Sequence, residues 1–313
     1  MGLCVGFDTS NYTTSVAWCD GGEGRNESRI LDVPKGALGL RQSDALFLHV
    51  RRLPEIMERA LNGRDLKGAS VVAASSRPRE NEDSYMPCFL AGICEGKTLA
   101  MALGARYMEF SHQQGHLAAA AWSAGHEELL NQPFLAWHLS GGTTELLHVV
   151  PDGAAIHAEI IGGTTDISAG QLLDRTGVLL DLPFPAGKYV DVLCGEAETG
   201  IKPFRVKLDG LRFSLSGMEN KVKAMAAAGE KQANICKFAV ETVASAVRRT
   251  TDAAKKQYPG LPVLCSGGVA SNSTLRQVMK DACFAAPEFS RDNAMGIAVL
   301  ARRTLERMEE TNG

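Results

Sequence analysis

Two histidines four residues apart are the clearest chemistry in the sequence. His112 and His116 lie in the segment Ser111-His-Gln-Gln-Gly-His116. If Ser111 caps a helix, both imidazoles project from one face of that helix, within reach of one metal ion. Two histidines that only pack at a helix start would show the same spacing. A metal needs a third ligand, for which Asp292 offers a carboxylate, although an aspartate before an apolar helix is also an ordinary N-cap.

The residue after the first histidine argues against a zinc peptidase. In the peptidase helix His-Glu-x-x-His the glutamate is the general base. Gln113 stands in that place here and cannot accept a proton from water. The sequence also has no G-x-S-x-G turn for a nucleophilic serine. We therefore expect neither a zinc peptidase of this type nor hydrolysis by a nucleophilic side chain.

Three turns rich in Gly, Ser and Thr follow predicted strands. Residues 3–18 and 134–150 each read as a hairpin, and residues 263–275 read as a strand, a Gly-Gly turn and a helix capped by Ser or Asn. Turns without bulky side chains let a phosphate approach backbone N–H groups, although a single such turn is more often only a tight turn. Repetition of the design predicts two similar lobes that clasp a nucleotide.

The elements between these turns predict a two-lobed α/β protein with mixed sheets flanked by helices. Apolar residues at helical spacing predict a helix over 235–256, and a second helix is expected over 292–310. Polar residues interrupt the apolar pattern near 127–132, and the last helix is expected to return to the first lobe. We therefore predict one lobe from residues 1–130 plus 293–313, another from 131–292, and a nucleotide cleft between them.

Composition indicates a folded cytoplasmic protein. With 45% hydrophobic residues among 313, the chain has the makeup of a globular protein. No apolar run reaches the ~18 residues of a membrane helix, and the N-terminus shows no secretory signal pattern, so we expect no membrane association. The eight cysteines include no C-x-x-C pair, which favours reduced, packed thiols in the cytoplasm.

Charge alone does not argue for a nucleic-acid partner, because the formal net charge is −3. Local basic clusters are present, and the ordinary interpretation of such clusters is a solvated face. The clusters are Lys202/Arg205/Lys207/Arg212 and Arg248/Arg249 with Lys255/Lys256.

Taken together, six motifs in order resemble those of the TsaD/Gcp family (older names: glycoprotease, peptidase family M22) along most of the chain. The family motifs are N-H-x-x-G-H, S-G-G-H-T, D-x-A-G-E-x-F-D-K with P-G-G, F-S-F-S-G, G-G-V-x-x-N and D-N-A. They correspond here to residues 111–116, 140–144, 166–175 with 185–187, 213–217, 267–272 and 292–294.

The resemblance implies a fold of the actin/Hsp70/sugar-kinase class and transfer of threonylcarbamoyl from its adenylate to an adenosine beside the tRNA anticodon. It implies one divalent metal, iron or zinc, with magnesium possible alongside a nucleotide such as ATP. TsaB-like and TsaE-like proteins would be partners, in a homodimer or heterodimer. The implied metal ligands are His112, His116 and Asp292; Ser140, Gly141 and Gly142 would meet phosphate, and Asp174, Gly187, Gly267, Gly268 and Asn272 would hold the nucleoside.

Several positions depart from the family pattern and indicate a divergent paralogue. An acidic pair in the first turn is replaced by Tyr12 and Thr13, and the glycine loop G-P-G-L-x-G-S-L is replaced by the charged segment 76–87. Two alternatives therefore stand beside the family reaction: a related enzyme that uses ATP or an adenylate on another acceptor, and a non-catalytic subunit. Three further replacements are Thr143 for the histidine of S-G-G-H-T, Ile167 for a second aspartate and Gln171 for a glutamate.

Overall fold

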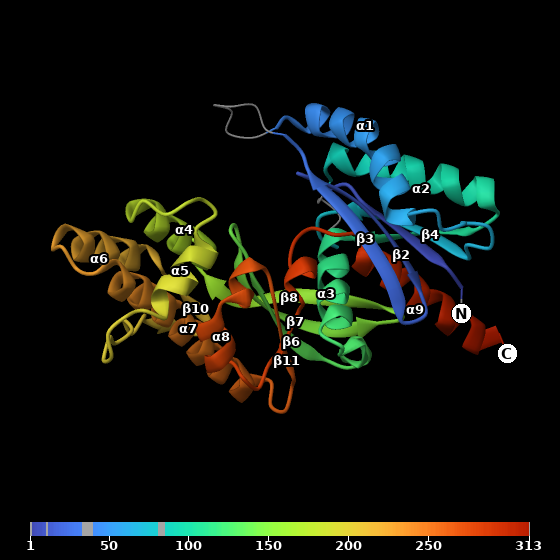
Figure 1. Ribbon diagram of the computed structural model, residues 1–313. Coiled ribbons are helices and arrows are strands. Elements are labelled where there is room, and N and C mark those ends of the chain that lie inside the picture. Colours follow the sequence, from blue (N-terminus) through green and yellow to red (C-terminus); the bar gives the residue numbers. More distant parts are fainter. Residues whose placement is uncertain (1, 11, 33–39, 81–84, 313) are drawn as a thin grey trace. The chain divides into compact units, whose positions relative to one another are not determined.

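The structure is a computed structural model that describes residues 2–10, 12–32, 40–80 and 85–312 (Figure 1). The chain forms two compact units. Unit 1 comprises Met1–Asn131, Val150–His157 and Arg291–Gly313, and unit 2 comprises Gln132–Val149 and Ala158–Ser290. Unlike the predicted domain ranges, these units place residues 150–157 and 291–292 with the N-terminal part of the chain.

Unit 1 is built on a five-stranded sheet in the order β3-β2-β1-β4-β5. Strand β1 pairs antiparallel with β2 and parallel with β4, so the predicted first hairpin is confirmed. All five residues of β1 are buried, as expected of a central strand covered on both faces. The strands are β1 (Cys4–Asp8), β2 (Thr13–Asp20), β3 (Glu23–Ile30), β4 (Val71–Arg77) and β5 (Arg106–Ser111).

Helices cover both faces of this sheet. Figure 1 shows α1 and α2 on one face, where Leu53, Ile56 and Ala91 pack against Val5 and Phe7 of β1. On the other face α9 lies against β1. The helices of unit 1 are α1 (Gln42–Leu61), α2 (Leu90–Leu103), α3 (His112–Ser123) and α9 (Met295–Asn312), with 3₁₀ turns at Pro87–Phe89 and Glu127–Asn131.

Glycines permit the close approach of α9 to its neighbours. A Cβ on Gly6 of β1 would lie 2.7 Å from Ala294 O and from Ala298 N. A Cβ on Gly296 would lie 1.7 Å from the carbonyl oxygen of Gly115 in α3. Side chains larger than hydrogen are therefore excluded at both contacts, and α9 is fixed against the strand and against the helix that bears the two histidines.

Unit 2 contains most of a seven-stranded sheet in the order β12-β11-β6-β7-β8-β10-β9, of which only residues 150–157 belong to unit 1. Strands β6 and β7 pair antiparallel, which confirms the second predicted hairpin, and β11 lies parallel to β6. The strands are β6 (Phe134–Leu139), β7 (Thr144–Asp152), β8 (Ala155–Thr164), β9 (Leu208–Asp209), β10 (Arg212–Phe213), β11 (Val263–Ser266) and β12 (Cys283–Phe284).

The long helix α7 packs against this sheet through the core of unit 2. It spans Gln232–Gln257, so the helix predicted over 235–256 is confirmed. Trp137 of β6 is fully buried, and its indole N–H donates to Thr251 Oγ1 at 2.8 Å. The other helices of unit 2 are α4 (Ala169–Leu179), α5 (Gly187–Cys194), α6 (Ser216–Ala227) and α8 (Ser273–Val278), with 3₁₀ turns at Gly268–Ser271 and Pro287–Phe289.

Two further predictions concern the C-terminal part of the chain. The strand, Gly-Gly turn and capped helix predicted over 263–275 are confirmed as β11, the turn at Gly268–Ser271 and α8. The last helix begins at Met295, three residues later than the predicted start at 292. Among the described residues, no helix is both long and apolar enough to span a membrane.

Candidate metal centre

The two histidines lie in the first two turns of α3, which Ser111 caps. The Ser111 hydroxyl oxygen accepts from the backbone N–H of Gln114 at 3.2 Å, and the Gln114 side chain accepts from the backbone N–H of Ser111 at 2.7 Å. These reciprocal bonds form a capping box and fix the point at which the helix begins. The predicted cap is therefore confirmed, and His112 and His116 lie one helical turn apart on the same face.

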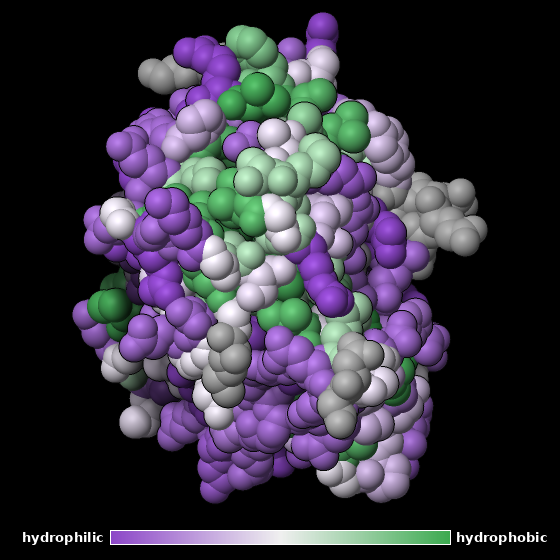
Figure 2. All heavy atoms as spheres, turned by 90° about the vertical axis from the view of Figure 1, so that its right-hand side faces the viewer, coloured by the Kyte–Doolittle hydropathy of each residue, from purple (hydrophilic) through white to green (hydrophobic). Residues whose placement is uncertain are grey.

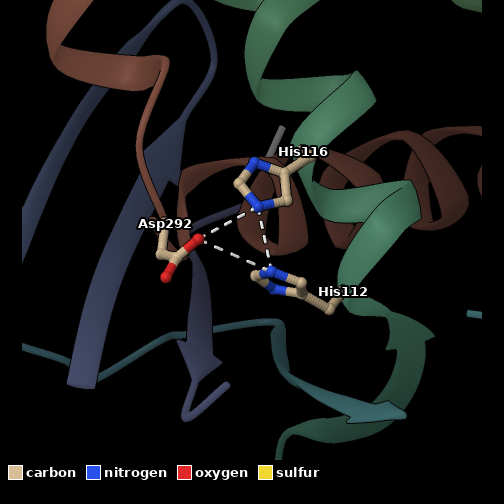
Figure 3. A group of neighbouring side chains, drawn as sticks. All are labelled: His112, His116 and Asp292. Atoms are coloured by element: carbon tan, nitrogen blue, oxygen red, sulfur yellow. Dashed lines mark hydrogen bonds and ion pairs between the residues drawn. The ribbon is translucent and has the colours of Figure 1, made fainter. Parts of the chain in front are cut away.

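The side chains of His112, His116 and Asp292 converge on one point (Figure 3). The two Nε2 atoms are 2.9 Å apart, and Asp292 Oδ1 lies 3.2 Å from His116 Nε2 and 3.7 Å from His112 Nε2. Ligands bound tetrahedrally to zinc at about 2.0–2.1 Å are separated from one another by about 3.4 Å. The three ligand atoms therefore already have the spacing of one coordination sphere.

Asp292 precedes α9 and does not cap it. The side chain of Asn293 accepts from the backbone N–H of Met295 at 3.1 Å, and the N–H of Ala294 donates to Asn26 Oδ1 at 2.9 Å. The Asp292 carboxylate instead divides its oxygens between the histidines and Thr13, whose hydroxyl donates to Oδ2 at 2.9 Å. The interpretation of Asp292 as an ordinary N-cap is therefore wrong.

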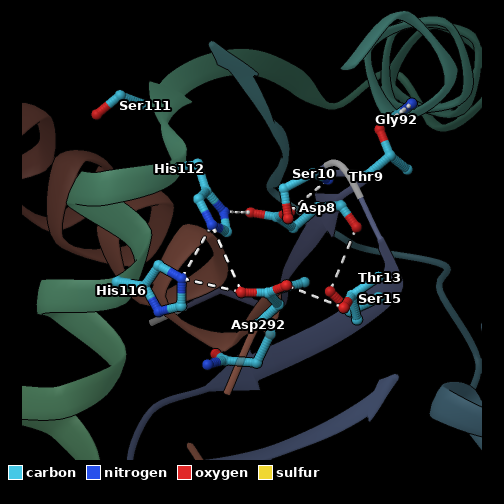
Figure 4. A network of polar contacts seen from close by, with 12 residues as sticks. Asp8, Thr9, Ser10, Thr13, Ser15, Gly92, Ser111, His112, His116 and Asp292 are labelled. Atoms are coloured by element: carbon cyan, nitrogen blue, oxygen red, sulfur yellow. Dashed lines mark hydrogen bonds and ion pairs between the residues drawn. The ribbon is translucent and has the colours of Figure 1, made fainter. Parts of the chain in front are cut away.

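A buried carboxylate lies behind the histidines (Figure 4). Asp8 at the end of β1 is fully buried, and its Oδ2 lies 2.7 Å from His112 Nδ1. Its Oδ1 accepts from the N–H of Ser10 at 2.9 Å. A carboxylate on Nδ1 fixes the ring so that Nε2 is presented to a metal. Sequence reasoning missed this role, although an aspartate that ends a wholly apolar central strand is itself a signal.

Charge and burial oppose each other in this cluster. Burial lowers the pKa of His112, but the charge of Asp8, its hydrogen bond and the charge of Asp292 raise that pKa to about 9. Burial raises the pKa of Asp292, but the hydrogen bond from His116 and the charges of both histidines hold it well below its usual value. Without a metal, the cluster therefore holds an extra proton on His112, which an entering cation would displace.

The predicted phosphate turn lies at the end of β6 in unit 2. Its Ser140 hydroxyl accepts from the backbone N–H of Thr143 at 3.0 Å, and Ser168 Oγ donates to the Gly141 carbonyl at 2.7 Å. The second Gly-Gly turn begins beside it, because a Cβ on Gly267 would lie 2.2 Å from the carbonyl oxygen of Leu139. The structure thus brings the 140–143 turn together with the start of α4 and with Gly267.

Four of the predicted ligand-binding glycines face open space. A Cβ added to any of them would meet no heavy atom within 4 Å, and none has the positive φ that favours glycine. Neither packing nor backbone conformation therefore requires glycine there, whereas Gly267, with φ 95°, is required by both. The four are Gly141, Gly142, Gly187 and Gly268.

The remaining predicted nucleoside residues take part in local structure. Asp174 Oδ1 accepts from the N–H of Ala186 at 2.8 Å, immediately before Gly187. The Asn272 side chain caps α8 by accepting from the N–H of Leu275 and donates to Asp191 at 2.9 Å. Asp174 thus fixes the turn before Gly187, and Asn272 fixes the start of α8. These contacts are compatible with a bound nucleoside but do not require one.

Some departures from the family pattern have a clear structural use. Thr13 positions the metal-facing Asp292, as described above. Gln171 closes a capping box with Ser168 at the start of α4, where its side chain accepts from the Ser168 N–H at 3.1 Å. Ile167 packs against the core of unit 2. Of the charged segment 76–87, residues 81–84 lie outside the described residues.

Comparison with known proteins identifies the family. The model of the family TsaD, tRNA N6-adenosine threonylcarbamoyltransferase, matches residues 42–299. The tRNA N6-adenosine threonylcarbamoyltransferase of Thermus thermophilus is 34% identical over 268 residues, which cover 83% of this chain and 79% of that protein. The chain belongs to the TsaD family. The resemblance inferred from the six motifs is confirmed.

Solved structures show the fold class of this TsaD-family chain. Component A of (R)-2-hydroxyglutaryl-CoA dehydratase from Acidaminococcus fermentans matches 98% of this chain and all of its own, with a TM-score of 0.56 and 14% identity. A putative N-acetylmannosamine kinase from Listeria monocytogenes matches 98% and 99%, with a TM-score of 0.51 and 11% identity. The α/β fold of the actin/Hsp70/sugar-kinase class is therefore confirmed.

Proposed function

We propose that the chain is a metal-dependent transferase that moves threonylcarbamoyl from its adenylate to an adenosine beside the tRNA anticodon. The observation that carries this proposal is the convergence of two imidazoles and a carboxylate, supported by Asp8, in a member of the TsaD family. Two imidazoles and one carboxylate suit iron or zinc and leave coordination positions open for substrate oxygens.

His112, His116 and Asp292 would hold the metal. When bound, a divalent cation supplies a Lewis acid that polarises a carbonyl or phosphoryl oxygen. The protein residues around it orient these ligands: Asp8 holds the His112 ring, and Thr13 holds the second oxygen of Asp292. In the proposed reaction the exocyclic amine of adenosine attacks the threonylcarbamoyl carbonyl and AMP leaves, so no nucleophilic side chain is needed.

The glycine turns of unit 2 would bind the nucleotide, either ATP or the adenylate, with magnesium possible alongside it. Ser140, Gly141 and Gly142 would meet the phosphates, because open glycine positions let backbone N–H groups approach an anion. Asp174 and Asn272 would hold the nucleoside between the turns. Gly187 and Gly268 would leave room for it, and Gly267 would hold the second turn close to the Leu139 carbonyl.

Partners and location complete the proposal. Figure 2 shows hydrophobic residues gathered on the face that it draws. Separately, α1 and α2 expose the apolar side chains of Phe47, Val50 and Met101. Such a surface suits a protein partner, and we assign it to a TsaB-like or TsaE-like protein or to a second copy of the chain.

All eight cysteines are free thiols, which supports a cytoplasmic location.

Metal analysis tests the site. Purified wild-type protein is expected to retain about one equivalent of iron or zinc per chain, and His112→Ala to retain much less. His126→Ala is the matched control, because His126 is an exposed histidine of unit 1 that pairs with Glu128. Equal metal content in wild type and His112→Ala would overturn the site assignment.

Complementation tests the reaction. Expression in a strain that lacks its own TsaD is expected to restore threonylcarbamoyladenosine in bulk tRNA, measured by mass spectrometry of nucleosides. His116→Ala should abolish the restoration. If the expressed wild-type protein binds metal and nucleotide but restores no modified nucleoside, the acceptor is a different one. If it restores no modified nucleoside and binds nucleotide but no metal, the non-catalytic subunit becomes the better interpretation.

A further inference from the structure

The two basic clusters of unit 2 have different surroundings. Arg248 pairs with Asp252 at 2.9 Å and donates to the carbonyl of Val278. Arg249 donates to the carbonyl of Val206 at 2.7 Å. The guanidinium groups of this cluster are therefore engaged in holding the protein together.

The cations of the 202–212 segment are turned outward. In the described part of the chain they form no ion pair, and all of them are exposed. Asp209 is the single acidic residue between 202 and 212. Glu219 of α6, the helix whose Lys221 contacts Phe204, is already paired with Arg175 and Lys223. The exposed cations are Lys202, Arg205, Lys207 and Arg212.

Backbone contacts hold this segment in place. The N–H of Phe204 donates to Thr242 Oγ1 of α7 at 2.9 Å, and the carbonyl of Val206 accepts from Arg249. Val206 is buried in the core of unit 2 while its neighbours Arg205 and Lys207 are exposed. Arg212 is exposed on β10, beyond the β9–β10 turn, where it pairs in register with Asp209. The backbone contacts of Phe204 and Val206 fix Arg205 and Lys207 in place, which lowers the entropy that a ligand must remove on binding.

An aromatic residue, Phe204, lies between Lys202 and Arg205 in the segment. Phe204 keeps 38% of its surface exposed, and Lys221 Nζ of α6 lies 4.7 Å from its ring centroid. Exposed aromatic faces among lysines and arginines are the means by which proteins bind nucleic-acid strands: the cations meet phosphates and the ring stacks on a base. An acidic protein would complement the positive charge of the segment, but it has no base to stack on the Phe204 ring.

We propose that the 202–212 segment, together with Lys221, binds the phosphate backbone of the tRNA, with Phe204 against an unstacked base. This inference rests on the proposed function, since it names the part of the protein that holds the acceptor. Because the whole chain carries a net charge of −3, the positive charge of this segment is local and does not belong to a generally basic surface.

Binding of an unmodified tRNA transcript to the full chain, followed by fluorescence anisotropy at several salt concentrations, tests the inference without requiring transfer. Arg205→Gln/Lys207→Gln/Arg212→Gln is expected to weaken binding and to reduce the slope of log K against log salt by about 2 to 3. The control Lys67→Gln/Lys256→Gln/Lys280→Gln removes the same charge at exposed positions elsewhere and should leave the slope near that of the wild type. Phe204→Leu should weaken binding without changing the slope.

Three outcomes would overturn the inference: equal slopes for the two triple variants, no tRNA binding by wild type at 50 mM salt, or competition by polyglutamate as strong as that by RNA of equal charge. The last would indicate a general site for acidic polymers. Complementation separates failure here from failure of the proposed function: if the chain restores threonylcarbamoyladenosine while the two triple variants have equal slopes, only the binding segment is wrongly assigned.

Discussion

Asp8 decides which nitrogen of His112 faces the Asp292 carboxylate. With its Oδ2 2.7 Å from Nδ1, it holds a proton on that nitrogen and leaves Nε2 for a metal. Removal of the charge at constant side-chain size isolates this effect. We predict that Asp8→Asn lowers metal affinity about 10- to 100-fold, measured by competition with a chelator. Asp65→Asn, at an exposed turn, should leave the affinity unchanged; equal affinities in all three proteins would contradict the orienting role.

Thr13 acts on the other side of the same ligand set. Its hydroxyl is 2.9 Å from Asp292 Oδ2, so Thr13→Val keeps the shape of the side chain and removes the donor. A lost hydrogen bond to a charged group costs about 1.5–3 kcal/mol, and we expect metal affinity to fall about tenfold or more. Thr13→Ser should retain most of the affinity. A fall as large in the serine variant as in the valine variant would refute a role for the hydroxyl.

At the scale of elements, contact between α3 and α9 places Asp292 beside the histidines. A Cβ on Gly296 would lie 1.7 Å from the Gly115 carbonyl and 2.7 Å from Ala119 N, so Gly296→Ala must separate the two helices. We predict a loss of unfolding free energy of about 1–3 kcal/mol or more, together with loss of bound metal. Urea denaturation and metal analysis measure the two effects. Gly22→Ala, where a Cβ meets nothing, serves as the control.

The start of α6 provides a pH-dependent prediction. Burial raises the pKa of Asp166, but hydrogen bonds from Ser214 and from the N–H groups of Leu215 and Ser216 hold it well below its usual value. A depressed carboxyl pKa stabilises the fold above the unfolded-state value near 3.9 and loses this effect as pH falls toward the folded value. Because Asp166 is exposed, we expect Asp166→Asn to cost only about 1 kcal/mol.

That cost should stay constant from pH 5 to pH 8 and shrink below pH 4. Urea denaturation of wild type and Asp166→Asn at each pH measures it. A difference that grows as the pH falls would contradict the assignment. Asp152→Asn, at an exposed position of β7, is the control.

Features that depend on nearby residues could be predicted from the sequence, whereas contacts between distant residues could not. Both hairpins, α7 and the Ser111 cap follow from patterns within about 25 residues, and local patterns are readable without a structure. Asp8 and Thr13 could not be assigned, because their partners lie 104 and 279 positions away. The sheet order brings the end of β1 beside the start of α3 and so joins Asp8 to His112, and the packing of α9 brings Asp292 to Thr13. Residues 150–157 belong to unit 1, whereas the predicted boundary puts them in the second lobe, because no local signal marks what a hairpin tip contacts.

At the scale of the whole molecule, cysteine reactivity follows burial. Burial raises the pKa of Cys4 to about 12 and that of Cys19 to about 11, and it raises the pKa of Cys265 to about 12. Cys94 on α2 is exposed. Since the thiolate is the reactive form, we predict that iodoacetamide at pH 8 modifies Cys94 first and spares the buried thiols of the folded protein. Peptide mass spectrometry measures this order, and early labelling of Cys4 would contradict the buried core.

The link between Thr13 and Asp292 spans 279 positions, and it has a consequence for synthesis of the chain. A ribosome must release residue 292 before the third ligand can join His112 and His116, so a nascent chain cannot build the site during most of translation. A bound metal would join the histidines of α3 to Asp292, which precedes the last helix and is hydrogen-bonded to Thr13 of the first hairpin. Its binding energy would then add to the free energy that keeps α9 docked, and release of α9 would release the ion.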